Sequence, residues 1–97
     1  MIVHIVMFTF KDENKELNIA KVKDKLEDLE KSINVLKSIE VGINFNESDR
    51  AMDVSLYSTF ETEEDLHIYA KHEAHLKVLS LIKEVTVESK VVDYMLE

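Results

Sequence analysis

The chain has 97 residues, of which 45% are hydrophobic and 33% are charged, and its formal net charge is −8 at pH 7. These values are typical of one soluble globular domain, so residues 1–97 are interpreted as a single domain. The acidic balance argues against nucleic acid and anionic membrane surfaces as partners, because both are bound through clustered Lys and Arg side chains. No apolar run approaches the ~20 residues that are needed to span a bilayer.

The sequence contains no cysteine, which excludes disulfides and thiolate chemistry. The opening MIVHIVMFTF is apolar, but it lacks the basic segment and the small-residue cleavage site of a signal peptide. We therefore interpret it as a strand, and we expect a cytoplasmic location.

Residues 2–10 alternate as a strand whose two faces are both largely apolar. The first face carries Ile2, His4, Val6, Phe8 and Phe10, and the second carries Val3, Ile5, Met7 and Thr9. A strand that is apolar on both sides must be covered on both sides, which is unusual for an antiparallel sheet with one wet face.

Turn and capping residues follow this strand, and a helix is predicted from there to about Ser32, with an apolar stripe at spacings of three and four. Residues 35–45 are predicted to form a second strand. Its Gly42, the only glycine of the chain, indicates a bulge or a close backbone approach.

Residues 52–60 alternate as a third strand, and the pair Thr62 and Asp65 then predicts the cap of a helix that begins at about residue 63. Residues 86–96 form the last predicted strand. The order strand, helix, strand, strand, helix, strand is the ferredoxin-like βαββαβ pattern of the α+β class. It implies a four-stranded antiparallel sheet with two helices on one face. Because the second face is also apolar, we expect a homodimer that buries sheet against sheet.

The stretch YAKHEAHLKV, residues 69–78, contains two of the four histidines. His75 lies on the apolar stripe of its helix, and the spacing of Tyr69 also places it inward. On an ideal helix these two residues are about 240° apart, so both face inward only if the helix breaks near residues 72–74. Such a break would bring Tyr69, His72 and His75 together, and His4 would join them if its face of the sheet meets the helices.

This group of residues could transfer protons without a cofactor. A neutral histidine accepts a proton at neutral pH, and a tyrosine hydroxyl can donate to a developing enolate oxygen. In this hypothesis His75 is the base, Tyr69 is the hydrogen-bond donor, and His4 orients or contacts the ligand. The expected apolar wall consists of Val6, Phe8, Leu56, Val78 and Leu79, with His72 at the rim.

Two other readings of the histidines remain open. Inward histidines are often hydrogen-bonded core residues without a chemical role. The spacing H-x-x-H could also supply two metal ligands, but a site needs three or four, and Glu73 points away on a helix. We therefore expect no metal and no cofactor, and the absence of a triad or cysteine leaves a covalent nucleophile unsupported.

The motifs HIVMFTFKD, GIN, F-E-x-x-E-D-L-x-x-Y-x-x-H-x-x-H and VVDY together resemble the stress-responsive dimeric α/β-barrel (Dabb) domain family over nearly the whole chain. The resemblance implies a ferredoxin-like protomer whose sheets face each other in a dimer. In one plant branch, a polyketide cyclase, a histidine and a tyrosine of the long motif act in a cofactor-free aldol ring closure. They match His75 and Tyr69 here, and the opening-strand histidine matches His4. The family usually has proline where this chain has Glu73, and glutamate permits the helix break without enforcing it.

Two functions follow as hypotheses. The first is a homodimeric barrel that binds a small, mainly apolar carbonyl compound and performs acid–base chemistry of the aldol or cyclase type. The second is a stress-related binding or structural dimer without chemistry, whose histidines are held by internal hydrogen bonds. A cavity that reaches His75 and Tyr69 would favour the first hypothesis, and a filled core would favour the second.

Overall fold

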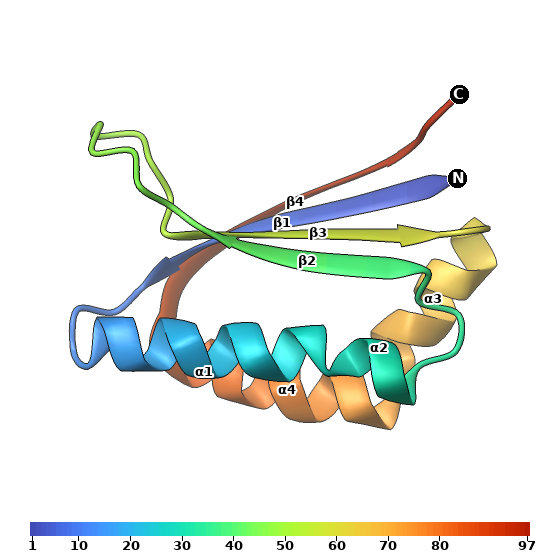
Figure 1. Cartoon of the computed structure of the whole chain (residues 1–97), viewed down its shortest axis with the longest axis horizontal. Helices are drawn as coiled ribbons and strands as arrows, with labels where there is room; N and C mark the ends of the chain where they lie inside the picture. The colour runs from blue at the N-terminus through green and yellow to red at the C-terminus, as the bar shows by residue number, and fades with distance from the viewer.

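The computed structural model describes all 97 residues and contains four strands and four helices. In chain order these are β1 (Ile2–Phe10), α1 (Lys15–Glu27), α2 (Leu29–Ser32), β2 (Ser38–Ile43), β3 (Val54–Phe60), α3 (Glu63–Lys71), α4 (Glu73–Val85) and β4 (Thr86–Met95). The strands form one antiparallel sheet in the order β2-β3-β1-β4, and all helices lie on one face of it (Figure 1). The predicted ferredoxin-like architecture is confirmed.

Each predicted helix is divided into two segments, and the second strand is shorter than the predicted range 35–45. The expectation of a bulge or close approach at Gly42 is wrong. The β2–β3 register runs through this residue without a shift, and a Cβ added there would meet nothing within 4 Å. The irregularity of the sheet lies instead between Thr9 and Phe10, where β1 pairs with β4.

The hydrophobic core lies between the sheet and the helices. It contains the first face of β1, including Phe8 and Phe10, together with the apolar stripes of α1 and α4. The histidine-bearing face of β1 is therefore turned toward the helices, as the site hypothesis requires. None of the helices combines the length and apolar character that a membrane crossing would need.

Two side chains of α1 protect the free edge of the sheet at β2. The ammonium group of Lys23 donates to the carbonyl of Val41 at 2.7 Å, and the carboxylate of Glu27 accepts from the amide of Val41 at 3.2 Å. The hydrogen bond from Lys23 also lowers the pKa of Glu27. This pair occupies backbone groups that would otherwise be free to bind another strand.

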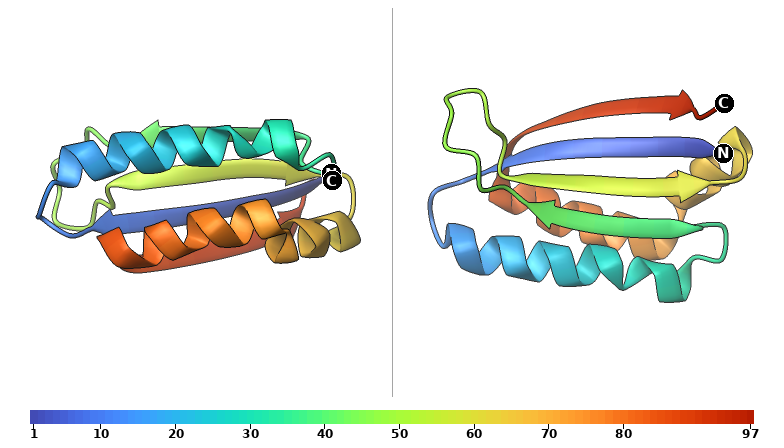
Figure 2. Two further views of the ribbon diagram at one scale, coloured as in Figure 1. Left: turned by 90° about the horizontal axis from the view of Figure 1, so that it is seen from below. Right: turned by 45° about the horizontal axis from the view of Figure 1, so that its top comes forward.

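The second face of the sheet has no helix over it (Figure 2). Apolar side chains from β1, β3 and β4 are exposed there: Met7 is 39% exposed, Tyr57 38%, Val92 50% and Tyr94 42%. They form a continuous surface, because Ile5 pairs with both Tyr57 and Val92 across the strands. We call this surface the open sheet face.

Candidate functional site

A break between α3 and α4 sets the geometry of the site. His72 has an extended backbone conformation, with ψ of 137°, and it separates the two helices. Its Nδ1 accepts a hydrogen bond from the amide of Ala74 at 3.0 Å, so the imidazole serves as the N-cap of α4. The break therefore forms without proline, because the side chain of His72 satisfies an amide that the interrupted helix leaves free.

The change of direction at His72 turns Tyr69 and His75 toward the same place. Their ring centroids lie 4.5 Å apart, and the centroid of His4 lies 6.2 Å from that of Tyr69. Phe60 packs against the tyrosine at 5.1 Å. Residues from α3, α4, β1 and β3 thus form one aromatic cluster, in which Tyr69 is only 1% exposed.

The backbone fixes the tautomer of His75. Its Nδ1 lies 3.0 Å from the carbonyl oxygen of Ala70. A carbonyl oxygen only accepts, so Nδ1 carries the proton and donates it, and Nε2 keeps a free lone pair. This is the arrangement that a general base needs.

His4 is oriented in the same way by a carboxylate. Its Nδ1 lies 2.5 Å from Oδ1 of Asp93 on the neighbouring strand β4, where the two residues are directly paired in the register. The carboxylate accepts from Nδ1, so Nε2 of His4 is also left without a proton when the ring is neutral. A second hydrogen bond, from the hydroxyl of Ser58 to the carbonyl of His4 at 3.1 Å, fixes the backbone at this point.

Burial shifts the acid–base properties of the cluster. Desolvation lowers the pKa of His75, the hydrogen bond to Ala70 opposes this shift, and the nearby His4 and His72 add to the lowering. Burial also raises the pKa of Tyr69, so its hydroxyl keeps its proton. The hydroxyl has no hydrogen-bond partner, although it is buried. The neutral imidazole of His75, a proton acceptor, thus lies beside the protonated hydroxyl-bearing ring of Tyr69, a hydrogen-bond donor.

A cavity of about 290 Å³ lies between the sheet and the helices, and both His4 and His75 line it. Most of the other lining side chains are apolar: Val6, Phe8, Leu26, Leu56, Leu79, Ile82 and Val91. The volume is near the lower end of the range for small-molecule sites. Lys83, Thr86 and Ser89 complete the wall.

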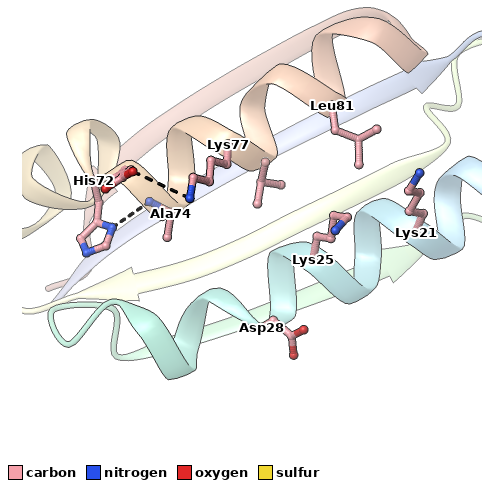
Figure 3. Close-up of a pocket in the computed structure, with 9 residues that line it drawn as sticks. Lys21, Lys25, Asp28, His72, Ala74, Lys77 and Leu81 are labelled. Atoms are coloured by element: carbon pink, nitrogen blue, oxygen red, sulfur yellow. Dashed lines mark hydrogen bonds and ion pairs between the residues drawn. The ribbon is translucent and has the colours of Figure 1, made fainter.

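The predicted site residues fall into three groups. His4, Val6, Phe8, Leu56, His75 and Leu79 line the cavity. Tyr69 does not line it, but its ring lies against the imidazole of His75. His72 and Val78 line a different, open groove of about 580 Å³ between α1 and α4 (Figure 3).

Sequence reasoning missed the contribution of β4. Asp93, Val91 and Ser89 alternate along this strand, and a partner for His4 could have been sought among them. Their position depends on the register between β1 and β4, which local patterns do not reveal. No group of three or more His, Cys, Asp or Glu side chains is placed to hold a metal ion.

The sequence profile of the stress responsive A/B barrel domain (Dabb) family matches residues 2–96. The chain belongs to this family. The match includes every residue of the aromatic cluster and of the cavity. No protein with a curated function matches the chain significantly.

Several solved structures have the same fold. A dimeric ferredoxin-like protein of unknown function from Bacteroides fragilis is 31% identical, with a TM-score of 0.90 over 98% of this chain and 95% of its own. A Dabb family protein from Mesorhizobium loti is 16% identical, with a TM-score of 0.82 over 99% and 96% of the two chains. The hydroxynitrile lyase from Passiflora edulis is 18% identical, with a TM-score of 0.88 over 99% and 93%. The last two similarities show the fold alone.

Proposed function

We propose that this Dabb protein binds a small, mainly apolar carbonyl compound in the cavity beside His4 and His75 and transfers a proton on it without a cofactor. The observation that carries the proposal is the cavity itself, whose apolar wall is interrupted by two imidazoles with free Nε2 atoms. Few polar groups in an apolar cavity are typical of a site that orients one functional group of a ligand.

The proposed reaction begins with His75. Its Nε2 removes a proton from the carbon next to the ligand carbonyl, and the carbonyl oxygen becomes an enolate. The enolate carbon then attacks a second carbonyl, as in an aldol step, and the imidazolium returns its proton to the new alkoxide. Because burial lowers the pKa of His75 from its ordinary value, the neutral imidazole is favoured and the base is available at neutral pH.

The enolate oxygen needs a hydrogen-bond donor, and we assign this role to Tyr69. Its hydroxyl is buried without a partner, and leaving such a group unpaired costs about 1–3 kcal/mol. Tyr69 lies outside the cavity wall, so its hydroxyl reaches a ligand only when an intervening side chain moves aside. His4, held by Asp93, is positioned to contact the ligand from the sheet side.

The active form in this proposal is a cytoplasmic homodimer joined through the open sheet face. The exposed apolar side chains of that face, among them Tyr57 and Val92, support the dimer. The relative from Bacteroides fragilis, which covers 98% of this chain, is described as dimeric. A two-fold axis would bury these side chains on both copies at once.

A non-catalytic, stress-related dimer is the second candidate. The hydrogen bond from His75 to Ala70 favours it, because this bond closes the junction between α3 and α4 and would give the histidine a structural role. In that case the cavity would bind a ligand or remain empty, but no proton would move.

Deuterium exchange separates the two candidates. Phenylacetone in D2O exchanges the hydrogens next to its carbonyl when a base removes them. We expect the protein to accelerate this exchange above the buffer rate, and His75→Asn to return it to background, since the asparagine amide nitrogen can take the place of Nδ1 and donate to Ala70 but cannot act as a base. Equal rates for the protein and for buffer would reject the catalytic proposal for this class of ketone.

A further inference from the structure

The cavity has polar groups at two ends and apolar side chains between them. His4 and His75 form one end, and Lys83, Thr86 and Ser89 form the other. The middle of the wall is apolar and includes Val6, Leu56, Leu79 and Ile82. A ligand that fills this space therefore contacts polar groups at both of its ends.

The separation of the two ends follows from the elements that carry them. Lys83 follows His75 by eight positions on α4, which corresponds to about 12 Å along the helix axis. The sheet gives a similar value, because β1 runs four residues from His4 to Phe8, which pairs with Ser89, or about 13 Å. A lysine side chain extends roughly 6 Å from its Cα. The ammonium group of Lys83 can therefore approach a ligand atom about 6 Å from the histidine end.

Lys83 has no carboxylate within 4.0 Å, unlike the other lysine of α4, since Lys77 lies 3.8 Å from Glu73. It is the only cationic side chain of the cavity wall that does not depend on protonation of an imidazole. The hydroxyl of the neighbouring Thr86 donates to the carbonyl of Ile82 at 2.8 Å.

We infer that the natural ligand of this cavity is an oxo acid, with its carbonyl group at the histidines, an apolar segment in the middle, and a carboxylate at Lys83. The inference rests on the proposed function for the position of the carbonyl, and it adds the anionic group. In a protein with a net charge of −8, an anion is repelled at long range, so its binding requires a local cation in the cavity wall.

The open groove between α1 and α4 provides a contrast. Lys21, Lys25 and Lys77 line it, but so do Asp28 and Glu73 (Figure 3). Its charges are therefore mixed, and Lys77 has an acidic partner there. This makes Lys77 a matched control for Lys83, because both lysines belong to α4 and removal of either changes the net charge by the same amount.

A lysine in the last turn of a helix also interacts favourably with the helix dipole. The stability of a Lys83 variant therefore cannot test its role in binding. The test needs two ligands of similar shape, one with a carboxylate and one without. A suitable pair is 4-oxo-4-phenylbutyrate and its amide, 4-oxo-4-phenylbutanamide, which have nearly the same shape and differ in charge.

The dissociation constants of both compounds are measured by NMR titration, from the imidazole signals of His4 and His75, for the unmodified protein, Lys83→Met and Lys77→Met. We expect the acid to bind about five- to tenfold more tightly than the amide, which corresponds to one charge-assisted contact at a partly exposed site. Lys83→Met should abolish this preference without weakening the amide, and Lys77→Met should retain it.

Equal affinity of the unmodified protein for acid and amide would overturn the inference, as would a preference that survives in Lys83→Met. In both cases the amide still binds at the histidines, so the proposed function stands. Failure of both compounds to shift the signals of His4 and His75 would instead reject the inference together with the carbonyl site on which it rests.

Discussion

The hydroxyl of Tyr69 is the single buried side-chain polar atom that lacks a hydrogen-bond partner. Replacing it in Tyr69→Phe keeps the ring contacts with Phe60 and His75 but removes the unpaired group. We expect the free energy of unfolding to rise by about 1 kcal/mol, since the desolvation cost disappears, while acceleration of the proton exchange is lost. Urea unfolding and the deuterium assay measure the two effects. A large loss of stability would mean that the hydroxyl has a structural partner.

The half-buried imidazole of His75 makes stability depend on pH. Its pKa is lowered in the folded protein, so the unfolded chain binds the proton more readily. The contribution of the neutral ring is therefore fully present above about pH 6.5, its unfolded pKa, and is lost as the pH falls toward the folded pKa. We expect the unfolding free energy of the protein to decline between pH 7 and pH 5 more steeply than that of His75→Asn. Parallel declines in the two proteins would show that other groups cause the effect.

At the scale of elements, the break between α3 and α4 depends on the cap that His72 provides. His72→Ala removes the acceptor for the amide of Ala74 and should cost about 1 kcal/mol, whereas His72→Asn should retain most of the stability. Thermal unfolding of the two variants measures the difference. If the alanine variant were as stable as the asparagine variant, the cap provided by His72 would not stabilise the break.

Glu73 occupies the first position of α4, where proline is well tolerated. The extended backbone of His72 is also compatible with a following proline. We therefore expect Glu73→Pro to fold and to gain roughly 0.5 kcal/mol, mainly by restricting the unfolded chain. A strong destabilisation, measured by urea unfolding, would indicate that the helix is continuous at this point in solution.

This break is also where the sequence was most informative. The positions of Tyr69 and His75 on one ideal helix made a break near residues 72–74 the condition for the site, and the structure has the break between Lys71 and Glu73. The pairing of His4 with Asp93 could not be predicted in the same way, because 89 residues separate them and only the register of β1 with β4 brings them together. His72 and Val78 line the groove between α1 and α4. This groove depends on how the two helices pack, which local sequence patterns do not reveal.

At the scale of the whole molecule, one face of the sheet remains apolar and uncovered. A charge placed on it, as in Val92→Lys, would have to be buried in a sheet-to-sheet dimer and should shift the protein to monomer. Leu17→Lys is the matched control, because Leu17 is also exposed but lies on α1. Sedimentation velocity at micromolar concentration measures the distribution. A dimer that survives in Val92→Lys, or an unmodified protein that is monomeric, would contradict the proposed assembly.

In the proposed function, a small carbonyl compound binds between sheet and helices, beside His4 and His75. The most direct test is a long-range proton–nitrogen NMR spectrum of the four imidazoles during titration with phenylacetone. We expect the Nε2 signals of His4 and His75 to shift and saturate, and those of His67, on a separate part of the surface, to stay unchanged. Unchanged signals of His4 and His75 at saturating ligand, or shifts confined to His67, would contradict it.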